Sequence, residues 1–208
     1  MTVFDRIVLL LTGLIAIYLI FYFVKKQRHP ETASSSNIYY ILSFAVLLIS
    51  GLLLIIFGWN ALKNDLVAIV AGLIPFGLAS GLVAKFFPKL EKGYVGLLAI
   101  GLVLIAITRL GDMVILGKVL YPIFHSIAGL TIFFLPLIAV KNGRAKGSFA
   151  YVTLGGTLIG LGGIALAFLS AERQLFFFSE DFVLMILAPL LFLTALFFGL
   201  GLIKGESA

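Results

Sequence analysis

Three ionisable side chains near the middle of the chain are the best candidates for chemistry: Arg109, Asp112 and His125. Arg109 and Asp112 are three residues apart, so on one helical turn their side chains can form an ion pair. Ionisable groups within an apolar span are costly to bury, so such a group is a candidate for a functional role. We therefore treat the three residues as a candidate polar site. A structural ion pair at a helix end, together with a histidine that only packs between helices, is the alternative interpretation.

Pro122 bears on where His125 lies. Proline favours the first position of a helix. A helix that begins at Pro122, rather than at Val119, places His125 in its first turn, near the membrane boundary and within reach of Asp112. The positive end of the helix disfavours a protonated imidazole and Asp112 favours one, so the charge state of His125 stays open.

Several other chemistries do not fit the residues. Ser80 and His125 are expected at depths of ~21 Å and ~9 Å from the same membrane face, too far apart for a serine nucleophile and its base. His29 lies in a connection, so it cannot share a haem with His125. A retinal-type photoreceptor needs a lysine inside the last span, and positions 183–203 have none. The chain has no cysteine. We expect no catalytic residues, metal or cofactor.

The elements that must position these residues are membrane spans. The chain is 62% hydrophobic and 12% charged, whereas soluble domains are about 45–50% apolar and about 25% charged. A bilayer must therefore be its solvent, and only helices or closed barrels satisfy the backbone there. We predict an all-α integral membrane protein, with residues 1–208 forming one transmembrane domain of seven spans. The spans are expected at 7–24, 38–62, 66–84, 94–110, 119–140, 149–169 and 182–203, with the fourth ending at Leu110 or continuing toward Leu116.

Basic residues predict the orientation of this seven-helix bundle. The first, third and fifth connections and the C-terminal tail hold ten of the fifteen basic residues: Lys25, Lys26, Arg28, Lys85, Lys89, Lys92, Lys141, Arg144, Lys146 and Lys204. Connections rich in Lys and Arg stay in the cytoplasm. The N-terminus is therefore predicted outside and the C-terminus in the cytoplasm. The scattered basic residues do not indicate nucleic-acid binding.

The sixth predicted span carries a row of small residues that indicates helix packing. Gly156, Gly160, Gly163 and Ala167 fall on one stripe, and small residues let membrane helices approach closely. The spacing predicts a helix-packing face, and close approach of a lipid, a quinone-like ligand or a second protein is the alternative.

The sequence leaves two main classes of function open. The first is a non-catalytic subunit, anchor or assembly partner of a larger membrane complex, suggested by short connections and small-residue faces. The second is a small transporter or channel with its polar site at the outer end of the fourth and fifth spans. An enzyme acting on lipid ranks third. The expected partners are the lipid bilayer and other membrane chains or a second copy. Short connections and a simple topology favour a multi-pass protein of a prokaryotic-type cytoplasmic (cell inner) membrane.

Overall fold

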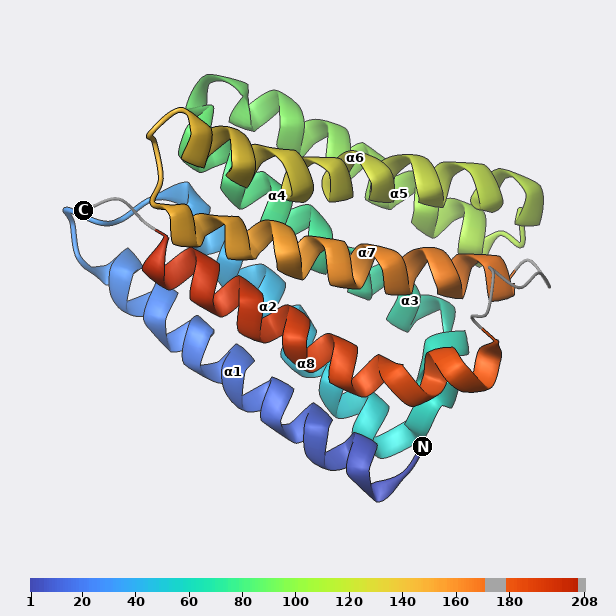
Figure 1. Cartoon of the computed structure of the whole chain (residues 1–208). Helices are drawn as coiled ribbons and strands as arrows, with labels where there is room; N and C mark the ends of the chain where they lie inside the picture. Colours follow the sequence, from blue (N-terminus) through green and yellow to red (C-terminus); the bar gives the residue numbers. More distant parts are fainter. Residues whose placement is uncertain (171–178, 206–208) are drawn as a thin grey trace.

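The fold is built from helices throughout the part of the chain that can be described. The computed structural model describes residues 1–170 and 179–205, with the backbone alone described for 165–170. No strand occurs among these residues (Figure 1). The α-helices are α1 (Val3–Arg28), α2 (Ser35–Phe57), α3 (Asp65–Ala71), α4 (Leu73–Phe86), α5 (Glu91–Leu110), α6 (Val114–Lys141), α7 (Tyr151–Ser170) and α8 (Glu180–Lys204), and the 3-10 helices are η1 (Gly58–Lys63), η2 (Pro88–Leu90) and η3 (Gly147–Ala150).

Within the described residues, seven helical segments are long and apolar enough to cross a membrane. They are Val3–Arg28, Ser35–Lys63, Asp65–Phe86, Pro88–Leu110, Val114–Lys141, Gly147–Ile164 and Glu180–Lys204. This confirms the prediction of seven long apolar helices. Most of them begin or end several residues beyond the predicted bounds, because polar residues such as Lys25 and Glu91 still extend the helices at their ends.

The turn between α5 and α6 corrects one prediction. α5 ends at Leu110, and Asp112 adopts a left-handed conformation with φ 52°. α6 then begins at Val114, five residues before the predicted bound at Val119, and Pro122 lies two turns inside the helix, so the alternative start at Pro122 is wrong. A break in the helix would leave several backbone groups unsatisfied, whereas a proline removes only one donor.

The third span is interrupted near Pro75. α3 ends at Ala71, and Gly72 joins it to α4. Pro75 has no N–H to bond the carbonyl of Ala71, four residues earlier, so the regular helical ladder fails at this point. The predicted single helix over 66–84 is therefore two consecutive helices.

Six of the helices form a closed ring. α1 packs on α2, α2 on α4, α4 on α6, α6 on α7, α7 on α8 and α8 on α1, while α5 packs outside the ring against α4 and α6 (Figure 1). α4 is thus covered on both sides, and its residues from Phe76 to Ala84 are all buried.

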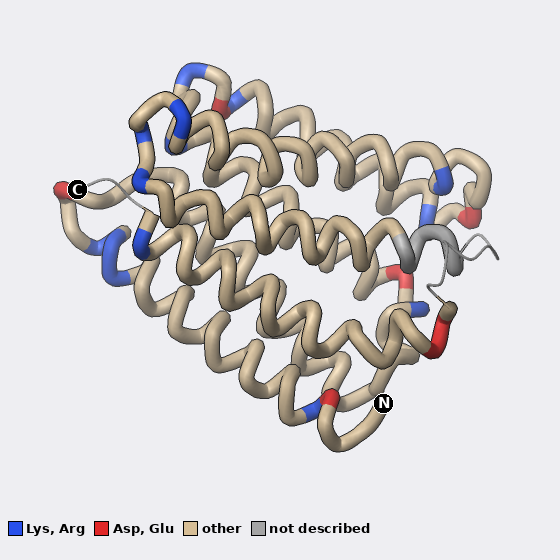
Figure 2. Tube along the Cα trace, in the orientation of Figure 1, with Lys and Arg blue, Asp and Glu red and all other residues tan. Residues whose placement is uncertain are grey.

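The bundle has two ends with different charge. The ten basic residues of the first, third and fifth connections and of the α8 terminus lie together at what we call the basic end (Figure 2). The opposite end, here the mixed-charge end, carries both signs, including Lys63, Asp65, Arg109 and Asp112. The first residue of α1 and the last residue of α8 lie at opposite ends (Figure 1).

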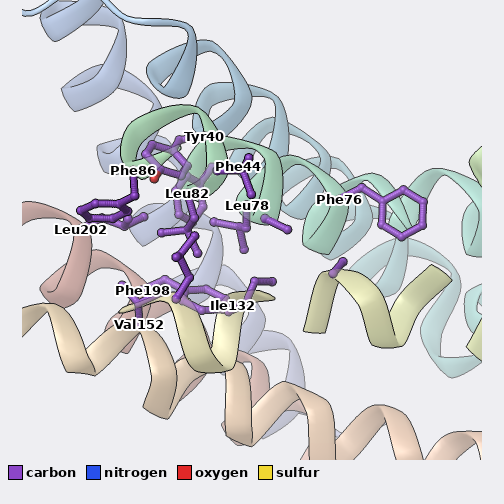
Figure 3. Packing of buried hydrophobic residues seen from close by; sticks show 14 of the residues in the cluster. Tyr40, Phe44, Phe76, Leu78, Leu82, Phe86, Ile132, Val152, Phe198 and Leu202 are labelled. Atoms are coloured by element: carbon purple, nitrogen blue, oxygen red, sulfur yellow. The ribbon is translucent and has the colours of Figure 1, made fainter. Parts of the chain in front are cut away.

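The main apolar core lies toward the basic end. Phe23 is fully buried, stacks on Phe44 with ring centroids 6.3 Å apart, and lies 5.0 Å from the ring of Tyr40. Phe86 meets Phe149 edge-on at 5.4 Å. Figure 3 shows Phe86 close to Leu202, with Tyr40 and Leu82 nearby. Aromatic rings from five segments (α1, α2, α4, η3 and α8) thus hold the helices together at this end.

Candidate functional site

Arg109 forms an ion pair with a residue that the sequence did not suggest. Its Nη1 donates to Oδ1 of Asp65 at 2.9 Å, and the two side chains are 34% and 51% exposed. Asp65 begins α3, whose first turn is capped by the side chain of Asn64. The expected pair of Arg109 with Asp112 is not formed, because α5 ends between the two residues and Asp112 turns away into solvent.

Tyr121 connects this ion pair to His125. The guanidinium carbon of Arg109 lies 5.4 Å from the centre of the Tyr121 ring. That ring stacks on the imidazole of His125, with centroids 5.3 Å apart and planes inclined by 19°. Tyr121 and His125 are four residues apart on α6, so they occupy adjacent turns of one face. The site therefore consists of Asp65, Arg109, Tyr121 and His125, in that order from the mixed-charge end inward.

His125 lies deep in the bundle. It is the twelfth residue of α6, so it lies ~17 Å from the helix start at a rise of 1.5 Å per residue. Its Nδ1 atom is buried and has no hydrogen-bond partner among the described residues. A buried polar atom without a partner costs about 1–3 kcal/mol, so its retention calls for an explanation.

The other ring nitrogen of His125 faces α7. A Cβ atom placed on Gly163 would lie 3.8 Å from Nε2. Because Gly163 has no side chain, the backbone of α7 lies close to the imidazole on this side. The arrangement provides one group that can accept or donate a proton, the imidazole of His125. The ring of Tyr121 lies between this imidazole and the exposed ion pair of Arg109 and Asp65.

The predicted packing face of α7 divides into parts with different neighbours. A Cβ on Gly156 would lie 2.7 Å from Ile132 of α6, so this glycine permits close approach of the two helices. A Cβ on Gly160 would meet nothing within 4 Å. The side chain of Ala167 lies outside the described residues. The sequence missed a second face, in which Gly155 and Gly162 lie against Phe198 and Leu190 of α8.

α5 has an exposed glycine pair that the sequence analysis also missed. Gly93 and Gly96 lie on the outer face of the helix, and a Cβ on either would meet nothing within 4 Å. Gly101 on the same helix faces inward, where a Cβ would lie 2.3 Å from the ring of Phe124. The i, i+3 spacing of Gly93 and Gly96 was the available signal.

Sequence reasoning found Arg109 and His125 and missed Asp65 and Tyr121. Tyr121 lies within the predicted span 119–140, four residues before His125, so this helical spacing was the available signal. Asp65 is 44 residues from Arg109, and only tertiary packing brings the two together. No group of three or more metal-ligating side chains is present in the described part of the chain.

These features define a class of protein: an all-helical bundle in which, over the described residues, seven helices are long and apolar enough to cross a membrane. Comparison with protein-family models, with curated proteins and with solved structures finds no match.

Proposed function

We propose that this protein is an integral membrane component that joins a larger membrane assembly as a non-catalytic subunit, anchor or assembly partner. Its outer surface supports the membrane location. Large apolar side chains are exposed on every side of the bundle, among them Phe21 (69%), Ile100 (60%) and Met185 (62%). Monomeric soluble proteins rarely expose contiguous apolar patches of such extent.

The observation that carries the assembly role is the open face of α5. One stripe along this peripheral helix consists of exposed residues: Gly93, Gly96, Ile100, Val103 and Ile107. Membrane helices associate through small residues that admit a second backbone. At several inward-facing glycines of the bundle, a neighbouring side chain already occupies the space where a Cβ atom would lie. At Gly93 and Gly96, no atom of this chain occupies that space within 4 Å.

The orientation and the membrane are part of the same proposal. The basic end would face the cytoplasm, which leaves the N-terminus outside and the C-terminus inside. Short connections between the helices favour a prokaryotic-type cytoplasmic membrane.

Native mass spectrometry from mild detergent tests the assembly role. Protein isolated at native expression should carry at least one further chain, either another membrane protein or a second copy. The Gly93→Leu/Gly96→Leu variant should lose that chain, because leucine fills the space a partner backbone needs. Gly51→Leu is the matched control, since a Cβ there also meets nothing within 4 Å. A partner-free wild-type protein would contradict the proposal.

The unpartnered Nδ1 of His125 favours a second candidate, a small proton-linked transporter or channel. The ion pair of Arg109 and Asp65 would form its outer opening and His125 its proton-binding group. Proton flux into liposomes, followed with an enclosed pH-sensitive dye, should be lost in His125→Ala and kept in Asp112→Asn. Equal flux in both variants would remove this candidate.

A further inference from the structure

A surface hollow opens at the basic end, where α1 leaves the apolar part of the bundle. Its volume is about 710 Å³, and it is lined by Tyr22, Lys25 and Lys26 of α1 and by residues 29–32 of the connection that follows. The three helical residues are spaced i, i+3 and i+4, so they lie on one face near the end of the helix. A volume of this size lies within the range of small-ligand sites, about 300–1,000 Å³.

The connection that follows α1 folds back to form the opposite wall. The hydroxyl of Thr32 donates to the carbonyl of Lys26 at 2.7 Å, and the backbone N–H groups of Thr32 and Ala33 donate to the carbonyl of His29 at 3.0 and 2.9 Å. Carbonyls at a helix C-terminus carry partial negative charge, which would repel an anion. These donors satisfy the carbonyl of Lys26 in the last turn of α1 and the carbonyl of the C-cap residue His29.

This connection is held in place by side chains. Oε1 of Gln27 accepts from the backbone N–H of Ser34 at 3.0 Å and from Nδ2 of Asn37 at 3.2 Å. Nδ2 of Asn37 also donates to the carbonyl of Thr32 at 2.9 Å, and Asn37 is only 2% exposed. The connection is polar and its sequence is typical of a flexible loop. These hydrogen bonds nevertheless fix it as one wall of the hollow.

The lining combines cations with an aromatic ring at the edge of the apolar belt. Lys25 and Lys26 outnumber the single acid, Glu31, and His29 adds a further nitrogen donor. The ammonium group of Lys26 lies 5.8 Å from the centre of the Tyr22 ring. Phe21, next in the chain to Tyr22, is 69% exposed, so lipid chains would reach the helix at this level.

We propose that the hollow binds the phosphate group of an anionic phospholipid, with Lys25 and Lys26 contacting the phosphate. The headgroup enters from the membrane plane beside Tyr22, and the wall at 30–32 closes the site toward the aqueous side. Basic pockets on the cytoplasmic side of membrane proteins bind such headgroups. The inference rests on the proposed membrane location and orientation, but it does not depend on a partner chain.

Retention of added lipid measured by native mass spectrometry tests the site. The probes are phosphatidylglycerol, phosphatidylcholine with the same acyl chains, and inorganic phosphate. The wild-type protein should retain phosphatidylglycerol in preference to phosphatidylcholine. One lysine near a lipid surface contributes about 1 kcal/mol, which is about five-fold, so Lys25→Gln/Lys26→Gln should reduce retention about 25-fold.

The control is Lys89→Gln/Lys92→Gln, which removes two exposed charges at the same end but outside the hollow. It should retain phosphatidylglycerol as the wild type does. Equal losses in both double variants, or equal retention of the two lipids, would overturn the proposal. So would displacement of the lipid by inorganic phosphate at millimolar concentration, because the source would then be a soluble anion. Partner chains appear as separate masses in the same spectra. The assembly role can therefore fail while lipid retention is still observed, and the two outcomes are distinguished.

Discussion

The two halves of the bundle are packed differently. Toward the basic end, aromatic rings from α1, α2, α4, η3 and α8 form one large buried cluster, and Phe23 and Phe149 are 0% exposed. Toward the mixed-charge end, α3 has no buried residue, and the second cluster of the described residues has Leu9, Leu54, Ala61 and Ala188 as its buried members. The aromatic rings of the core therefore gather mainly in the basic half, and Phe76, Ile105 and Phe124 extend the same cluster toward the mixed-charge end.

Several glycines of α4, α6, α7 and α8 differ in how closely a neighbouring helix covers them. A Cβ on Gly81 of α4 would lie 2.3 Å from the ring of Tyr40, and one on Gly201 of α8 would lie 2.6 Å from Val152. Farther from the basic end, Gly129 and Gly160 have open space in front of them. α6 and α7 thus approach closely near Gly156, leave the space beside Gly160 open, and meet again at His125, where a Cβ on Gly163 would lie 3.8 Å from Nε2. The buried imidazole without a partner lies in the less tightly packed half.

The largest effect is expected from removing an aromatic ring of the basic half. Phe23→Ala should lower the free energy of unfolding by about 3 kcal/mol, because the fully buried ring leaves a cavity among Tyr22, Tyr40 and Phe44. Phe21→Ala, two residues away at a side chain that is 69% exposed, should have little effect. Thermal unfolding in detergent measures both. Equal stability of the two variants would contradict the claim that Phe23, and not Phe21, belongs to the core.

Glycine substitutions test where α6 and α7 separate. Gly156→Ala should destabilise the protein by about 1 kcal/mol because the new methyl group overlaps Ile132. Gly160→Ala should be neutral or stabilise by up to about 1 kcal/mol, because alanine favours the helix and space is available. The same unfolding measurement applies. A loss of stability in Gly160→Ala would show that the helices are close at this level as well.

Substitution of Arg144 tests a side-chain hydrogen bond between two connections at the basic end. Its Nη2 donates to the carbonyl of Phe86 at 2.5 Å, and its guanidinium lies 5.5 and 5.4 Å from the centres of the Phe86 and Phe87 rings. Arg144→Gln should cost about 1 kcal/mol, a value that reflects the exposure of this side chain. Lys141→Gln removes an equal charge three residues earlier and should leave the unfolding temperature unchanged. An equal fall of the unfolding temperature in both variants would show that the loss of a positive charge, and not the contact of Arg144 with Phe86, lowers the stability.

The smallest effect is expected at the ion pair of the mixed-charge end. Asp65→Asn should lower stability by about 0.5 kcal/mol or less, because both partners are partly exposed and screened by solvent. The effect should shrink at high salt. Asp112→Asn should have no effect. A loss above about 2 kcal/mol on Asp65→Asn would show that the mixed-charge half depends on this pair for its structure.

Much of the fold could be predicted because hydrocarbon length and charge placement constrain it directly. Apolar runs such as 7–24 and 182–203 are about as long as a bilayer core is thick, so helices there follow from backbone hydrogen bonding. Helix ends were less predictable. Asp112 ends one helix through a backbone conformation unusual for a residue with a side chain, and Pro122, a common first residue, lies inside the next helix.

The candidate site was predictable only in part, for a related reason. The presence of Arg109 and His125 in apolar surroundings could be read from the chain. Their partners could not, since Asp65 approaches Arg109 through the packing of α3 beside α5. Tyr121 stacks on His125 through a helical turn that sequence patterns assigned to a helix start.

The central claim, that the bundle spans a membrane with its basic end in the cytoplasm, is tested most directly by cysteine labelling, because the chain has no native cysteine. Lys63→Cys lies at the mixed-charge end, and Ala33→Cys and Asn142→Cys lie at the basic end, all at exposed positions. A membrane-impermeant maleimide applied to intact cells should label position 63, and positions 33 and 142 only after permeabilisation. Labelling of 33 and 142 in intact cells, with 63 protected, would contradict the orientation. Labelling of all three positions only after permeabilisation would contradict the membrane crossing.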